Sequence, residues 1–243
     1  LEKFDSEVIS DLINTFYPQA IEEQKLSPII SPKIELERYD PDKDFTFTAQ
    51  TAIKPPVTVG DYRKALKELY AKKQTAQDSL PEAKDSKEHQ HVHLSPNDLV
   101  EAILSVTQIE IPELVVEEEV NRMLSRLVQQ LQPLNLDMNA YLKSINKTGE
   151  QLREEYAQVA QKNIAGEMAL LDLVNQAKTE VAESEIDATI NAIGDEKLKE
   201  RYQQNPLEKA YIKSIIAKNK FIWQAISEAE GEDHSHEQEE HAK

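Results

Sequence analysis

The sequence contains no cysteine among its 243 residues and only five glycines. Without cysteine the chain has neither a disulfide framework nor a thiolate metal site. Aromatic residues make up only 6% of the chain. An all-β domain needs many turns, and turns often use glycine, so this composition favours a helical protein. The glycines are also scattered, and no Gly-Lys-Ser/Thr sequence is present, which argues against a phosphate-binding loop.

Basic residues are scarce as well, with 28 against 45 acidic residues and a net charge of −17. Such a surface repels phosphate backbones and anionic lipids, so we expect no nucleic-acid or membrane partner. No apolar run approaches the ~18 residues that would span a bilayer, and the start shows no signal-peptide pattern. These absences predict a cytoplasmic protein. Because the chain starts at Leu1 rather than Met, we expect a fragment or a trimmed chain.

Residues for catalysis are missing from the predicted helices and strands. All six histidines fall in a polar stretch before residue 95 or in the last ten residues: His89, His91, His93, His234, His236 and His241. None lies on a predicted packed element that would hold a catalytic base rigidly, and no Gly-x-Ser-x-Gly turn is present. The sequence therefore predicts no catalytic residue and no enzyme activity.

Metal binding has one candidate, the alternating run His89-x-His91-x-His93, whose rings would share one side of an extended segment. The competing interpretation is a solvated polar loop, which we favour because no predicted structure flanks the run. The acidic run Glu117–Glu119 has an equally simple explanation, because carboxylates stabilise the first turn of a helix. We predict no metal site and no cofactor.

The first 74 residues have a mixed pattern. A helix is predicted over residues 5–24, strands over 33–39 and 45–53 with a turn at 40–44, and a further helix from Gly60 to about Lys73. The next stretch, 75–94, loses periodicity and is rich in polar residues, so it predicts a linker or mobile loop. We expect a small α+β domain with a β-hairpin at 1–74, joined by this linker to the rest.

From Ser95 onward the pattern is helical throughout. Helices are predicted from Ser95, over 112–131, 137–145, 148–178, 183–193 and 195–203, and from Pro206 to about 230. Thr148-Gly149-Glu150-Gln151 has the spacing of a capping box. The last helix has two apolar sides, which indicates a central position or a partner on one side. We expect a helical domain at 95–230 and a disordered acidic, His-rich tail at 231–243.

Four segments resemble the trigger factor family of ribosome-associated chaperones, in that family's order. The segment Ile109–Val120 is similar to the opening of its helical arm, and Tyr141–Ser144 followed by Lys147–Glu155 is similar to a later part of that arm. Near the start, two further blocks are similar to its ribosome-binding domain. They are Tyr17–Glu23 with Ser31–Ile34, and Phe45–Ala49 leading to Lys54-Pro55 and Gly60-Asp61-Tyr62.

The resemblance implies a mainly α fold, a multi-helix chaperone body with arms, plus a small α+β remnant of the N-terminal domain. In trigger factor a prolyl isomerase domain lies between these parts, whereas here only residues 63–97 separate the matching blocks. That is fewer than the ~50 residues of a small domain, so we expect the isomerase to be absent. The family's Gly-Phe-Arg ribosome-docking loop is not found; if the chain is trimmed, we expect it upstream of Leu1.

The implied function is that of an ATP-independent holdase, which binds unfolded or nascent polypeptides in an apolar-lined cradle and delays aggregation. Candidate client-binding residues are flexible or large apolar side chains of the helical domain: Met123, Leu127, Leu131, Met138, Tyr141, Ile164, Met168, Leu171, Ile216 and Trp223. Expected partners are such polypeptides, the ribosome if the docking loop exists, and a second copy of the chain. The alternatives are an assembly module that binds one folded partner and a prolyl isomerase of unrecognised type.

Overall fold

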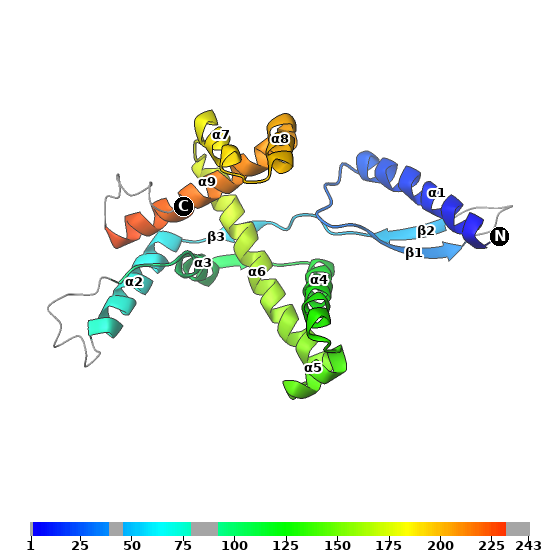
Figure 1. Ribbon diagram of the computed structural model, residues 1–243, viewed down its shortest axis with the longest axis horizontal. Helices are drawn as coiled ribbons and strands as arrows, with labels where there is room; N and C mark the ends of the chain where they lie inside the picture. Colours follow the sequence, from blue (N-terminus) through cyan, green and yellow to red (C-terminus); the bar gives the residue numbers. More distant parts are fainter. Residues whose placement is uncertain (1, 39–45, 79–91, 232–243) are drawn as a thin grey trace. The chain divides into compact units, whose positions relative to one another are not determined.

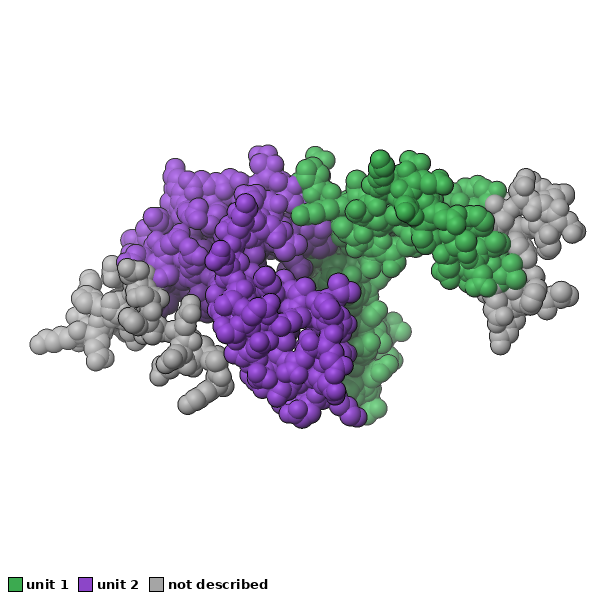
Figure 2. All heavy atoms as spheres, turned by 90° about the horizontal axis from the view of Figure 1, so that it is seen from above, with its two compact units in different colours: residues 1–56, 110–161 green, residues 57–109, 162–243 purple. Residues whose placement is uncertain are grey.

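A computed structural model describes residues 2–38, 46–78 and 92–231, and it is mainly α-helical as predicted. The chain forms two compact units, each discontinuous in sequence (Figure 2). Unit 1 contains residues 1–56 and 110–161, and unit 2 contains residues 57–109 and 162–243. Each unit has a buried apolar core of its own.

The first part of unit 1 is a helix and a hairpin. α1 spans Glu2–Glu23, and the strands β1 (Lys33–Arg38) and β2 (Thr46–Gln50) pair antiparallel, with Ile34 opposite Ala49 and Leu36 opposite Phe47 (Figure 1). These apolar pairs share one side of the hairpin because side chains alternate along a strand. The predicted hairpin is confirmed, while its predicted turn at 40–44 lies outside the described residues.

The second part of unit 1 is helical and is called the arm here. It comprises α4 (Glu113–Leu131), the 3-10 turn η2 (Gln132–Leu134), α5 (Met138–Ser144) and the first half of α6 (Gly149–Ala177). Asp137 caps α5 by accepting the Ala140 N–H at 2.6 Å. Thr148 and Gln151 exchange hydrogen bonds of 2.9 and 3.2 Å at the start of α6, so the predicted capping box is confirmed.

Unit 2 contains a short antiparallel ladder that the sequence analysis missed. β3 (Val57–Val59) pairs with β4 (Thr107–Ile109), although the chain was expected to be wholly helical after Ser95. Three-residue strands give too little alternation to be recognised from sequence. At Gly60, which follows β3, an added Cβ would lie 3.2 Å from Val106, so glycine lets the two segments approach closely.

The main core of unit 2 lies among α2 (Tyr62–Asp78), α3 (Pro96–Ser105), the second half of α6 and α9 (Pro206–Glu230). Its buried side chains come from all four helices; among them are Leu66, Leu99, Ile103, Leu170 and Phe221. Leu94, within the stretch predicted to be a linker, is also buried in this core. The helix predicted to end near Lys73 runs on to Asp78.

Two short helices complete unit 2. α7 (Glu183–Asn191) and α8 (Glu196–Gln204) pack against each other and against α9 (Figure 1). Their core is a separate cluster of Ile186, Ile190 and Ile212. α7 ends two residues earlier than predicted, and α8 runs one residue further.

Candidate functional site

Large apolar side chains remain exposed on both units. The most exposed in the helical parts are Leu134 on η2, Leu207 and Tyr211 near the start of α9, and Trp223 further along it. Single exposed apolar residues are ordinary on protein surfaces, whereas neighbouring ones mark an interaction site.

In the arm, exposed leucines lie at the connection between α4 and α5. Leu134 and Leu136 are 69% and 38% exposed, and Met138 and Tyr141 follow on α5 as half-buried side chains. Met138 and Tyr141 pack against the buried arm core of Leu127, Leu131 and Leu152. We call Leu134, Leu136, Met138 and Tyr141 the arm surface.

The local sequence explains why the arm surface is open. Pro133 lies two residues after the end of α4, within the 3-10 turn, and Asn135 adopts the left-handed conformation with φ of 51°. The chain thus turns sharply, and the leucines on either side of Asn135 project from a turn rather than from a packed helix face. The Asp137 cap then restarts the helix at Met138.

The ten residues that the sequence predicted to bind clients lie in both units, and they differ in how exposed they are. Met123, Leu127, Leu131, Met138 and Tyr141 belong to unit 1, and Ile164, Met168, Leu171, Ile216 and Trp223 belong to unit 2. Leu127 and Leu131 are buried in the arm core. Leu171 and Trp223 are about half exposed, and the other six are half-buried.

Sequence reasoning missed Leu134, Leu136, Leu207 and Tyr211 as exposed apolar residues. For Leu134 and Leu136 a signal was present, because leucines beside Pro133 and Asn135 lie in a turn between predicted helices. For Leu207 the signal was its place in the first turn of α9, directly after the proline that begins the helix. Tyr211 lies on an apolar side of α9, and only tertiary packing decides that it is exposed.

Acidic side chains pair locally rather than forming a site. Arg122 contacts Glu118 at 3.5 Å and Glu119 at 3.2 Å along α4, which agrees with a structural role for the run Glu117–Glu119. Among the described residues no group of three His, Asp or Glu side chains is arranged to hold a metal ion. His89 and His91 lie outside that part of the chain, and His93 approaches Glu230 with its Nδ1 at 3.7 Å.

Shifted pKa values also have structural causes. Burial raises the pKa of Tyr62, which packs on Phe221 in the core of unit 2. Hydrogen bonds from Lys220 and from the Ala182 N–H lower the pKa of Glu185 at the start of α7. Among the described residues, neither Tyr62 nor Glu185 lies beside a catalytic nucleophile. Both shifts are explained by packing and by helix-end hydrogen bonds.

Two protein-family models match the chain. The family model described as "Bacterial trigger factor protein (TF) C-terminus" matches residues 66–227, and the model described as "Bacterial trigger factor protein (TF)" matches residues 2–85. The two matches overlap, so no unmatched residues remain between them for an intervening domain. No solved structure matches the chain.

Three curated relatives that match the chain are named trigger factor. The chain is 30% identical over 99 residues to a trigger factor of Exiguobacterium sibiricum, covering 41% of this chain and 23% of the relative. It is 29% identical over 130 residues to one of Caldicellulosiruptor saccharolyticus, covering 51% and 29%. A trigger factor of Bacillus cytotoxicus is 28% identical over 130 residues, covering 54% and 29%. The matched stretches thus span less than a third of each relative's length.

Proposed function

The chain belongs to the trigger factor family, and from this premise we propose that it is an ATP-independent holdase chaperone. It binds unfolded or nascent polypeptides through exposed apolar surface and delays their aggregation. The observation that carries the proposal is the arm surface: Leu134 and Leu136 are exposed, and Met138 and Tyr141 follow them within five residues as half-buried side chains on the arm core.

Binding at the arm surface follows from apolar burial. Covering one leucine side chain fully contributes roughly 1.5–3 kcal/mol, so a few such contacts give weak, reversible affinity after the costs of ordering a client. Met138 adds a flexible side chain that adapts to different client residues. Such contacts are non-directional, which fits a binder of many sequences better than a binder of one.

The net charge of −17 supports the same role. A strongly charged protein repels other copies of itself, and this repulsion keeps a holder with exposed leucines in solution. A bound client acquires the charge of its holder, so holder–client complexes repel one another too. Aggregation of the client is then slowed without any energy source.

We further propose that the chain has no prolyl isomerase activity and is not an enzyme. The overlap of the two family matches supports this, since no residues separate the two matched parts. From the family we also propose that the protein is located in the cytoplasm, docks on the ribosome and forms a homodimer.

Suppression of aggregation tests the holdase function. Citrate synthase unfolded in guanidinium is diluted into buffer with increasing amounts of the protein, and light scattering is followed. We expect scattering to fall as the protein approaches equimolar amounts, and a Leu134→Ser/Leu136→Ser variant to need several-fold more. The matched control is Leu26→Ser/Leu36→Ser, which removes two exposed leucines elsewhere in unit 1.

The outcomes separate the alternatives. No suppression at several-fold excess contradicts a holdase, and capture of one folded partner at fixed stoichiometry would instead indicate an assembly module. Equal loss in both leucine variants contradicts the assignment to the arm surface but not the holdase function. A proline-peptide isomerisation assay is expected to give the uncatalysed rate.

A further inference from the structure

α7 and α8 form a small, separable part of unit 2. They pack against each other and against α9 around three buried isoleucines, Ile186, Ile190 and Ile212. The main core of the unit contains thirteen buried residues and does not include any of these three. Each backbone residue that is ordered costs conformational entropy that burial must offset. Only Val181, Tyr202 and Ile216 add partly buried apolar surface to these isoleucines. This core is small for two helices of nine residues each, so we expect α7–α8 to open more readily than the main core.

The surface that α7–α8 covers continues into an exposed one. Ile212, Ile216 and Trp223 are spaced by four and seven residues, so they share one side of α9. Ile212 is buried under α7–α8, Ile216 is half-buried against the same cluster, and Trp223 is 54% exposed. We call these three residues the α9 stripe. Its far end is open while its near end is covered by another part of the same chain.

Ion pairs at the surface hold α7 on α9. Lys209 contacts Glu183 at 2.9 Å and Asp187 at 3.3 Å, and Lys220 contacts Glu185 at 2.6 Å. These side chains are at least partly exposed, and pairs of this kind contribute little to stability and are screened by salt. The contact is therefore specific in position but weak in free energy, which is the property of an element that can be displaced.

We propose that α7–α8 is a lid that occupies the α9 stripe until an apolar segment of an unfolded polypeptide displaces it. This proposal rests on the proposed holdase function. The α9 stripe would be a second surface for the same clients. The client's apolar side chains take the positions of Ile186 and Ile190 against Ile212 and Ile216, and they extend onto Trp223. An aliphatic occupant is indicated because the lid itself presents isoleucines to the stripe.

The lid has a quantitative consequence for affinity. When only the open fraction binds, the observed dissociation constant equals the intrinsic constant divided by that fraction. Any change that loosens α7 therefore tightens client binding, and any change that fixes α7 weakens it. A surface that was permanently open would respond to neither change.

Trp223 provides a direct readout, because it is the single tryptophan of the chain. The client is reduced, carboxymethylated ribonuclease A, an unfolded chain that contains no tryptophan. Titration with this client is expected to shift the emission of Trp223 to shorter wavelength as the stripe is covered. Glu185→Gln, which keeps the capping acceptor but removes the charge opposite Lys220, is expected to lower the titration midpoint about threefold. The matched control is Glu101→Gln, which breaks the exposed pair with Lys162 at 3.8 Å in the same unit and is expected to leave the midpoint unchanged.

Cross-linking tests the lid in the opposite direction. The absence of cysteine allows Glu183→Cys/Lys209→Cys to be joined selectively by a short bismaleimide. We expect the cross-linked protein to need at least tenfold more client for the same shift in Trp223 emission. The same variant capped with N-ethylmaleimide is the control, and circular dichroism checks that both remain folded.

Hydrogen exchange gives an independent measurement. Client binding is expected to accelerate exchange of the amides of α7, residues 183–191, and to leave those of α3, residues 96–105, unchanged. If the unmodified protein suppresses aggregation but the cross-linked and capped forms give the same midpoint, the lid inference is wrong and the holdase function stands. If the unmodified protein neither suppresses aggregation nor binds the client, the holdase proposal fails and the lid inference fails with it.

Discussion

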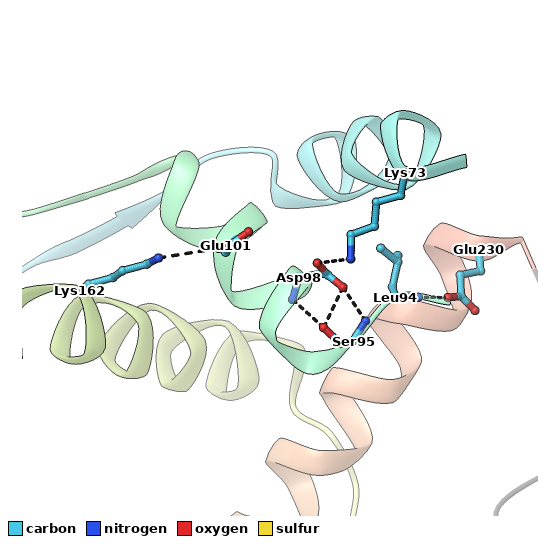
Figure 3. Close-up of polar contacts among 7 residues, drawn as sticks. All are labelled: Lys73, Leu94, Ser95, Asp98, Glu101, Lys162 and Glu230. Carbon is cyan, nitrogen blue, oxygen red and sulfur yellow. Dashed lines mark hydrogen bonds and ion pairs between the residues drawn. The ribbon is translucent and has the colours of Figure 1, made fainter. Parts of the chain in front are cut away.

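The ammonium nitrogen of Lys73 lies 2.7 Å from a carboxylate oxygen of Asp98, joining α2 to the first turn of α3 (Figure 3). The other carboxylate oxygen accepts the N–H and the hydroxyl of Ser95, both at 2.7 Å. Just before Ser95, the Leu94 N–H donates to the side chain of Glu230 at the end of α9. One short segment therefore links three helices of unit 2 at the edge of its main core.

Removing the Asp98 carboxylate is expected to destabilise unit 2. In Asp98→Ala the Ser95 N–H and hydroxyl lose their acceptor, and Lys73 loses its partner; Asp98 itself is only 6% exposed. Such losses cost about 2 kcal/mol in free energy of unfolding. Urea unfolding followed by circular dichroism measures the change. Glu101→Ala, an exposed acid on the same helix, is the control and is expected to change stability by less than ~0.5 kcal/mol.

Asp98 also predicts a pH dependence. Burial raises the pKa of Asp98, but hydrogen bonds from Lys73 and Ser95 outweigh that effect and hold it below its ordinary value. A carboxyl with a depressed pKa in the folded state stabilises the fold above its unfolded pKa of about 4, and this contribution is lost as pH falls through the folded value. The stability difference between the natural chain and Asp98→Ala should therefore be constant above about pH 5 and shrink below about pH 4. A difference that grows on acidification would contradict the assignment.

Local signals in the sequence predicted most of the helices. Ser95-Pro96 and Thr148–Gln151 begin helices because their side chains and backbone satisfy the free amides of the first turn, which needs no distant contact. The hairpin was also predictable, since Phe47 and Ala49 alternate with polar residues on β2.

Features that depend on distant residues were not predictable. β3 and β4 pair segments about fifty residues apart, and neither strand has a pattern of its own. The arm surface was found in part: Met138 and Tyr141 were predicted, but Leu134 was not, and Leu127 was selected although it is buried. Periodicity identifies the apolar side of a helix, and only packing decides how much of that side stays exposed.

Gly166 predicts an energetic coupling between α6 and α3. An added Cβ would lie 3.1 Å from a methyl group of Val100, closer than an ordinary contact. Alanine inside a helix is favoured over glycine by about 1 kcal/mol, so the clash should cancel that gain in Gly166→Ala alone. In a Val100→Ala background the same change is expected to stabilise by about 1 kcal/mol. A double-mutant cycle of urea unfolding measures the coupling, and additive effects would contradict close packing at this point.

Two leucines of the arm separate stability from binding. Leu127 is buried in the arm core, so Leu127→Ala is expected to cost about 2–5 kcal/mol in free energy of unfolding. Leu134 is 69% exposed, so Leu134→Ala should change stability by less than ~0.5 kcal/mol. The order should reverse for client binding. Leu134→Ala removes apolar area that a client would cover, and it is expected to weaken aggregation suppression at a temperature where both variants are folded.

The comparison is informative because both substitutions make the same chemical change within twenty residues of one chain. Urea unfolding and aggregation suppression are measured on both variants, with far-ultraviolet circular dichroism to confirm folding at the assay temperature. If Leu127→Ala alone impairs suppression while remaining folded, client binding depends on the packed arm core rather than on the exposed leucines, and the arm surface is not the primary site. If Leu134→Ala alone impairs it, the client binds the folded arm as described, because no loss of structure accompanies the loss of function.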